Sequence, residues 1–123
     1  MAGMSELLPV VALVRDLIFA SRISATAKAA GTDLKLVRNP IALGDEPARR
    51  LIVDLNLDGA IEASTRWKQA TGGEVVGFVS HVDTATIDRA RAAGVDRVLA
   101  RSRFVELLPV LVEPAPAPAE DTG

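Results

Sequence analysis

The chain alternates between short apolar runs and longer segments in which apolar residues recur every three or four positions. Five of the runs have the length of a strand, at residues 10–14, 34–37, 51–55, 74–80 and 98–100. The first lacks alternating polar residues, which is typical of a parallel strand covered on both faces. We therefore predict five strands, each followed by a helix or a loop.

The segments that follow the first two runs differ in their helical periodicity. Phe19, Ile23 and Ala27 fall on one face of a helix after the first run, and Gly31 provides its stop. Residues 38–50 contain two prolines and a glycine, which do not favour a regular helix. A second helix is therefore expected to be short or missing.

The second half carries clearer helix signals. Trp67 lies at helical spacing with neighbouring apolar residues, which indicates packing in the core or on a helix surface rather than a ligand platform. Asp83 is a candidate N-cap for the next helix, and Ser102 for the last one, over residues 103–112. Pro109 is expected to kink or split that last helix.

Strands joined through helices pair in parallel with right-handed crossovers, and their helices cover both faces of the sheet. The pattern therefore predicts a doubly wound, five-stranded parallel α/β sheet over residues 8–112. Residues 113–123 read EPAPAPAEDTG, and we expect them to form an extended, disordered tail. Ligands of such sheets bind beyond the carboxyl ends of the strands.

Composition removes several classes of function. The 123 residues include 14 Lys and Arg against 16 Asp and Glu, so no basic excess favours binding to nucleic acid. The chain contains no Cys, which excludes thiol chemistry. Its single histidine, His81, excludes multi-histidine metal sites and is expected to be a loop residue. The apolar start is interrupted by Pro9 and ends at Arg15-Asp16, too early for a membrane span. We expect a cytoplasmic protein.

Polar and charged residues follow four of the predicted strands. They are Arg15-Asp16 after the first, Asp54 and Asn56 at the third, Ser80 at the fourth and Arg101 at the fifth. Paired carboxylates suit Mg²⁺, and a hydroxyl beside a cation suits a phosphoryl group. Both kinds of ligand are therefore candidates for one crevice.

Residues 10–112 resemble a response-regulator receiver domain of the CheY-like superfamily, most closely over residues 51–59 and 93–99. The resemblance implies a flavodoxin-like sheet of strand order 2-1-3-4-5. It also implies that Asp54 accepts a phosphoryl group from a histidine kinase and that Ser80 is the switch hydroxyl. The Mg²⁺ ligands that it implies are Asp16, Asp54 and Asn56.

Two arginines depart from the receiver pattern. Arg15 stands where receivers have an acid, and Arg101-Ser102 stands where they have Lys-Pro. Two unit charges about 4 Å apart interact by roughly 4 kcal/mol at an effective dielectric of 20, so a guanidinium beside Asp54 would repel Mg²⁺. We therefore expect a divergent pseudo-receiver in which Arg15 or Arg101 pairs with Asp54 and no cofactor is bound.

The last predicted helix is apolar on nearly every side. A helix lying on a sheet needs only one apolar stripe, so part of this surface requires another cover. We expect a protein interface, such as a homodimer contact, through Phe104, Val105, Leu108 and Val112. The alternative is that Val105, Val110 and Val112 are only partly exposed or are covered by the tail.

Three functions remain open from the sequence. The leading hypothesis is a stand-alone signalling or adaptor protein without catalytic turnover, acting through the last helix and an apolar loop at residues 17–19. The second is a functional response regulator, phosphorylated on Asp54 with Mg²⁺. The third is a module that binds a nucleotide or another small ligand, although no glycine-rich phosphate loop is present.

Overall fold

Five parallel strands form one sheet in the order β2-β1-β3-β4-β5. The computed structural model describes residues 8–113, so the predicted tail lies outside the described residues apart from Glu113. The strands are β1 (Val10–Leu13), β2 (Leu34–Val37), β3 (Arg50–Asp54), β4 (Glu74–Val79) and β5 (Arg97–Ala100). Both the predicted class of fold and the predicted strand order are confirmed.

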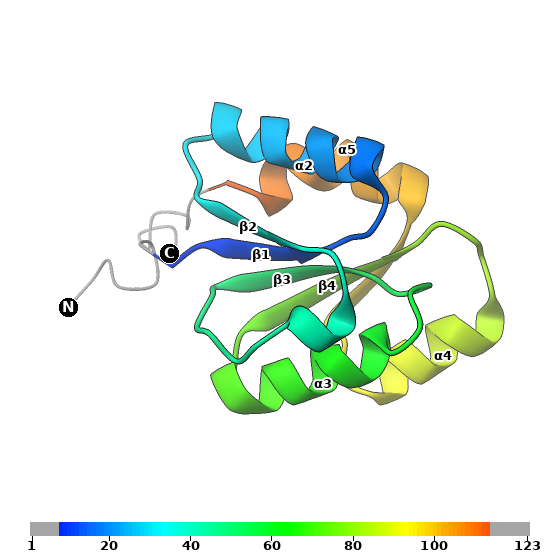
Figure 1. Cartoon of the computed structure of the whole chain (residues 1–123). Helices are drawn as coiled ribbons and strands as arrows, with labels where there is room; N and C mark the ends of the chain where they lie inside the picture. The colour runs from blue at the N-terminus through cyan, green and yellow to red at the C-terminus, as the bar shows by residue number, and fades with distance from the viewer. Residues whose placement is uncertain (1–7, 114–123) are drawn as a thin grey trace, which may run out of the picture.

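Helices cover both faces of the sheet. Figure 1 shows α2 (Leu17–Ala29) and α5 (Arg101–Leu111) on one face, with α3 (Ala60–Thr71) and α4 (Thr84–Ala92) on the other. Between β2 and β3 the chain forms only a 3₁₀ turn, η1 (Pro40–Ala42), which confirms that the second helix is short. None of the helices within residues 8–113 combines the length and the apolar character needed to cross a membrane.

The core beneath α2 and α5 is built around three phenylalanines. The ring of Phe78, from β4, lies 5.0 Å from that of Phe19 and 4.5 Å from that of Phe104, measured between centroids. All three side chains are buried. Aromatic pairs at these separations stabilise a core beyond the area that they bury. The cluster therefore fixes α2 and α5 against the middle of the sheet.

The same packing corrects the predicted interface on the last helix. Phe104, Leu108 and Val112 are at most 2% exposed, and Val105 is partly buried against the same core. These residues are covered by α2 and the sheet, so the monomer already uses the apolar surface that we assigned to a partner. Val110, at 56% exposed, is the large apolar residue that α5 leaves open.

The ends of the helices agree only in part with the sequence signals. Asp83 caps α4 through a hydrogen bond from the Ala85 N–H, as predicted. In contrast, α5 begins at Arg101 with Ala100 at the N-cap, so Ser102 lies inside the helix and is not its cap. The helix also continues through Pro109 rather than splitting there.

On the other face, Trp67 and Leu55 pack where two glycines leave room for them. Trp67 is 1% exposed, which confirms its predicted place in the core, and its Nε1 donates to the Glu46 carbonyl. A Cβ on Gly73 would meet the indole, and a Cβ on Gly77 would lie 2.6 Å from Cδ1 of Leu55. Glycine is therefore required in β4 at Gly77 by close packing and not by its backbone angles.

We expect Gly77→Ala to lower the free energy of unfolding by about 1–3 kcal/mol, because the new methyl group overpacks against Leu55. Urea denaturation measures this loss. Gly44→Ala is the matched control, since a Cβ there meets nothing within 4 Å. The cost of Gly77→Ala should shrink in a Leu55→Ala background; equal costs in both backgrounds would contradict this account of the contact.

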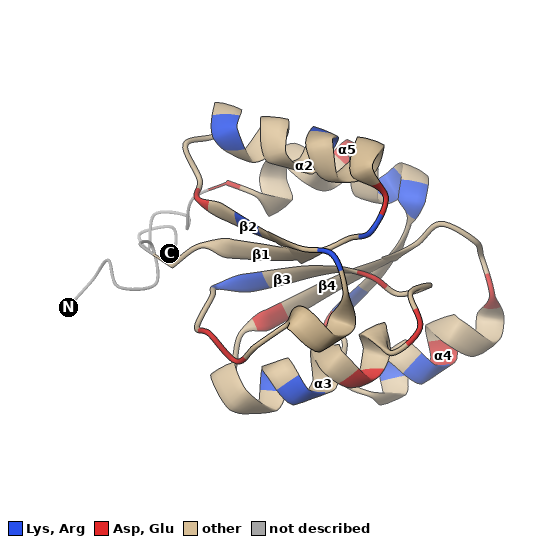
Figure 2. Cartoon of the chain, in the orientation of Figure 1, with Lys and Arg blue, Asp and Glu red and all other residues tan. Residues whose placement is uncertain are grey.

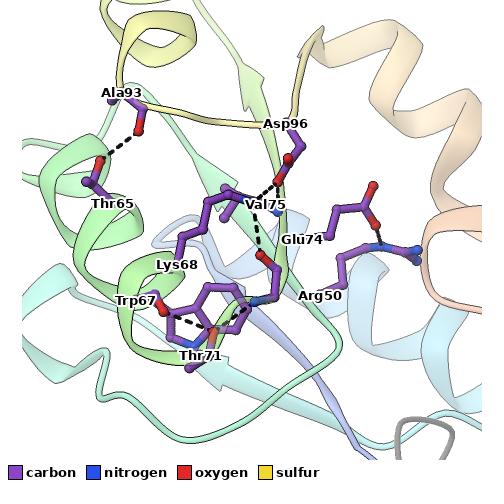
Figure 3. Close-up of polar contacts among 10 residues, drawn as sticks. Arg50, Thr65, Trp67, Lys68, Thr71, Glu74, Val75, Ala93 and Asp96 are labelled. Carbon is purple, nitrogen blue, oxygen red and sulfur yellow. Dashed lines mark hydrogen bonds and ion pairs between the residues drawn. The ribbon is translucent and has the colours of Figure 1, made fainter.

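Polar contacts tie the start of β4 to its neighbours (Figure 3). Asp96 Oδ2 accepts from Lys68 Nζ and from the Val75 N–H, each at 2.7 Å. Arg50 Nε donates to Glu74 Oε1, also at 2.7 Å. Burial pushes the pKa of Asp96 upward, but the hydrogen bonds from Lys68 and Val75 outweigh it and leave that pKa below its usual range. The ionised carboxylate therefore joins α3 to the sheet.

Because the pKa of Asp96 is depressed on folding, its contribution to stability is present above the unfolded pKa, about 3.9, and is lost as pH falls through the folded value. We expect Asp96→Asn to lower the free energy of unfolding by about 1 kcal/mol or less near pH 7, since the pair is partly exposed. The difference should vanish at acid pH. Glu62→Gln, which removes the more exposed pair with Arg89, is the control. A deficit that is independent of pH would contradict this role.

Candidate functional site

The carboxyl ends of the strands bring the predicted site residues to one edge of the sheet. Asp54 is the last residue of β3 and is half-buried. Asp16 follows β1, Ser80 follows β4, and Arg101 follows β5 directly. Figure 2 shows acidic and basic positions close together in the loops along this edge. The site is therefore assembled from segments that are distant in the sequence.

The side chain of Asp16 binds the backbone at the start of α2. Its Oδ1 accepts from the Ile18 N–H at 2.9 Å and from the Phe19 N–H at 3.1 Å, so Asp16 is the N-cap of the helix. The predicted apolar loop at residues 17–19 is consequently the first helical turn. Phe19 points into the core, whereas Leu17 and Ile18 are 63% and 83% exposed.

Arg101 lies between Asp16 and the aromatic core. Its Nη2 is 3.9 Å from Asp16 Oδ2, and its guanidinium carbon is 4.2 Å from the centre of the Phe19 ring. An ion pair and a cation–π contact thus hold this cation at the site. The arginine sits at the end of β5 as the sequence implied, but its ion-pair partner is Asp16.

Our prediction that Arg15 or Arg101 pairs with Asp54 is therefore wrong. Within residues 8–113 Asp54 has no ion-pair partner, and Arg101 acts on it only through its field. Arg15 lies in a separate cleft, where its backbone carbonyl accepts a hydrogen bond from Arg38 Nη2 at 3.3 Å. The physical reason is that the cap at Asp16 and the ring of Phe19 offer Arg101 two contacts at once.

Burial raises the pKa of Asp54 above its ordinary value. The Asn56 N–H, which donates to Asp54 Oδ1 at 3.0 Å, and the charge of Arg101 both act in the opposite direction, whereas the charge of Asp16 raises the pKa further. Among the described residues, no hydrogen bond reaches Oδ2 of this carboxylate. Asp54 thus keeps one oxygen without a hydrogen-bond partner among these residues, on a group whose ionised form is disfavoured.

Asn56 joins two loops of the site instead of presenting its amide oxygen. Oδ1 of Asn56 accepts from the Ser80 N–H at 2.7 Å and from the His81 N–H at 3.0 Å, and Nδ2 donates to the His81 carbonyl at 3.4 Å. Sequence reasoning missed this role, which becomes visible only when β3 and β4 are adjacent. Ser80 and His81 are both exposed, as expected for loop residues.

The predicted Mg²⁺ ligands do not form a suitable donor set in this arrangement. Asp16 Oδ1 caps a helix and Oδ2 faces Arg101, while Asn56 Oδ1 already accepts two hydrogen bonds. In residues 8–113 no three side chains from Asp, Glu and His come together closely enough to hold a metal ion. Mg²⁺ requires near-octahedral oxygen ligands, and among the side-chain oxygens of these predicted ligands only Asp54 Oδ2 has neither a hydrogen bond nor an ion pair within residues 8–113.

The sequence matches no protein-family model and no curated protein. Solved structures are similar in fold. A response regulator from Burkholderia pseudomallei, solved with a phosphorylated aspartic acid, calcium ion and citrate, has a TM-score of 0.72 at 17% identity, over 86% of this chain and 66% of that one. A two-component response regulator from Clostridium difficile has a TM-score of 0.74 at 16% identity, over 84% and 90% of the two chains.

A CheY-like receiver domain from Methanospirillum hungatei is also similar, with a TM-score of 0.69 at 11% identity over 85% of this chain and 96% of that one. This chain has the receiver fold. The predicted resemblance is thus confirmed for the architecture. At these identities the likeness concerns the receiver fold alone, so function has to be argued from the site.

We expect Asp54→Asn to unfold at a higher temperature than the parent protein at pH 7. Because folding raises the pKa of Asp54, the protonated carboxyl contributes fully to the stability of the parent protein below the unfolded pKa of Asp54, about 3.9. This contribution is lost as pH rises through the folded pKa. Asparagine keeps the oxygen that accepts from Asn56 but carries no charge. The gain should therefore disappear below about pH 4.

Thermal unfolding followed by circular dichroism across this pH range measures the effect. Asp88→Asn removes an exposed carboxylate on α4 and provides the control for the change in net charge. A loss of stability in Asp54→Asn at pH 7 would contradict the inference that the buried charge is unfavourable.

Proposed function

We propose that this protein is a signalling or adaptor protein that acts through protein contacts, without catalytic turnover and without accepting a phosphoryl group. One observation carries the proposal. Asp16, the acid that would hold Mg²⁺ in a working receiver site, caps α2 with one oxygen and faces Arg101 with the other. We infer a cytoplasmic location from the same signalling role.

Electrostatics explains why this arrangement opposes phosphotransfer. Mg²⁺ at Asp16 would have to displace the Arg101 guanidinium, which the ring of Phe19 also holds in place. The acid that normally adds a second negative charge is replaced by Arg15. Without the cation, only the field of Arg101 offsets the repulsion between Asp54 and an approaching phosphoryl donor, and the raised pKa of Asp54 reduces its ionised fraction.

Exposed apolar residues beside the crevice support a role in protein contacts. Leu17 and Ile18 form the outer surface of the first turn of α2, and Val82, in the loop after β4, is 68% exposed. In contrast, most of the apolar surface of α5 is covered by its own core. We therefore place the protein-binding surface at the start of α2 in preference to α5.

A functional response regulator is the second candidate. Asp54 Oδ2 remains available, and Ser80 and Arg101 lie along the same edge of the sheet. The similar Burkholderia pseudomallei protein was itself solved with a phosphorylated aspartic acid. If this second function is correct, the Arg101 guanidinium has to move away from Asp16 when Mg²⁺ binds. The two candidate functions therefore differ in whether that movement takes place.

The experiment is incubation of the full chain with acetyl phosphate and Mg²⁺, followed by intact-mass analysis, together with a beryllofluoride titration monitored by NMR. We expect no phosphoryl adduct and no saturable change in the spectrum. The double variant Arg15→Asp/Arg101→Lys, which rebuilds the acid pair and the lysine, should bind Mg²⁺ more tightly than the parent by at least tenfold. An adduct on the parent that Asp54→Ala abolishes would establish the second candidate instead.

A further inference from the structure

A cleft lies at the carboxyl ends of β1 and β2, on the same edge of the sheet as Asp54. Its volume is about 380 Å³, within the range of small-molecule sites, and its walls come from the loops after β1, β2 and β3. The lining residues are Arg15, Arg38, Asn39, Pro40, Leu57 and Asp58. Arg15 also stands at the metal position of the receiver pattern, but neither Asp54 nor the exposed apolar residues at the start of α2 belong to the lining of this cleft.

Two arginines meet there because of the strand register. β1 and β2 are aligned up to Leu13 and Val37, and the Val14 N–H donates to the Val37 carbonyl at 3.0 Å. Arg15 and Arg38 therefore follow equivalent ends of neighbouring parallel strands. Figure 2 shows basic positions side by side beyond these two strands.

Neither guanidinium is neutralised by a neighbour. Within residues 8–113, Arg15 and Arg38 form no ion pair with a carboxylate, although six such pairs occur elsewhere. Arg38 Nη2 donates to the Arg15 carbonyl, which holds the second guanidinium against the backbone that carries the first. Both side chains line the same cleft, and an anion bound there would be attracted by both positive charges.

Part of the cleft lining comes from the segment after β2, which local contacts hold in place. The Asn39 side chain accepts from the Ile41 N–H at 2.8 Å, and η1 begins with Pro40. The segment after Arg38 is therefore restricted by this capping hydrogen bond and by the pyrrolidine ring of Pro40. Asp58 contributes the one carboxylate of the lining. Its charge opposes that of the arginines and should weaken the binding of an anion.

We propose that the cleft binds the phosphate group of a small molecule, held between the guanidinium groups of Arg15 and Arg38. Guanidinium groups suit phosphate because their planar N–H donors form paired hydrogen bonds with its oxygens. The location agrees with the rule that open parallel sheets bind ligands beyond the carboxyl ends of their strands. The proposal goes beyond the signalling role and holds whether or not Asp54 is phosphorylated.

The test is an NMR titration of the full chain with two probes, inorganic phosphate and glycerol 3-phosphate, at low ionic strength. We expect saturable shifts that map to residues 15, 38–40 and 57–58. Arg15→Ala and Arg38→Ala should each weaken binding by about tenfold or more, because each removes a charge-assisted hydrogen bond. Asp58→Asn should tighten binding, and Asp54→Asn should leave the same cleft residues shifting.

Arg91→Ala is the matched control, since Arg91 is an exposed arginine on α4 and lies far from this lining in the sequence. Thermal unfolding of each variant checks that it is folded. Tighter binding of glycerol 3-phosphate would assign the site to phosphate esters, and equal binding of both probes would assign it to the phosphate group itself. The proposal is overturned if Arg91→Ala and Arg38→Ala weaken binding equally, or if the shifts do not saturate.

Discussion

The contact of Arg101 with Phe19 and Asp16 connects the core of the protein to its candidate site. Phe19 is buried against Phe78 and Phe104, and these residues come from α2, β4 and α5. The position of the Arg101 guanidinium is thus set by the packing of the hydrophobic core as well as by charge. Mg²⁺ at Asp16 would have to compete with both kinds of interaction, because removing the guanidinium breaks the ion pair and the cation–π contact together.

Capping has a similar effect on Asp16. A carboxylate that accepts from two backbone N–H groups stabilises the first turn of a helix and offsets the positive end of the helix dipole. Redirecting Asp16 to a cation would weaken the start of α2, the turn that presents Leu17 and Ile18 to solvent. Metal binding at this site and the conformation of the exposed apolar turn are therefore coupled through the side chain of Asp16.

The central strands β1, β3 and β4 could be predicted because buried parallel strands appear as largely apolar runs, and the short helix because two prolines fall between β2 and β3. The role of Asp16 as a cap could also have been predicted, since an acid directly before an apolar helical segment is a capping signal. The resemblance to receivers instead implies that Asp16 is a metal ligand and that residues 17–19 form a loop, which conflicts with that local signal.

The rest depends on tertiary contacts that periodicity does not encode. An excess of apolar residues on α5 predicts burial but does not distinguish a partner from α2 and the sheet, which in fact cover Phe104 and Leu108. In the same way, the sequence placed Arg101 near two carboxylates without showing which one it faces. Only the three-dimensional position of Phe19 decides in favour of Asp16.

The carboxyl edge of the sheet consequently divides into two regions of different charge. Around β3 and β5, two acids, Asp16 and Asp54, lie near the single Arg101, whereas two arginines and a single carboxylate, Asp58, line the cleft beyond β1 and β2. One change of residue type, an arginine at position 15 in place of the acid usual in receivers, contributes to both regions. It removes a negative charge from the metal position and adds a positive charge beside Arg38, so the same substitution that disfavours a cation at one place favours an anion at the next.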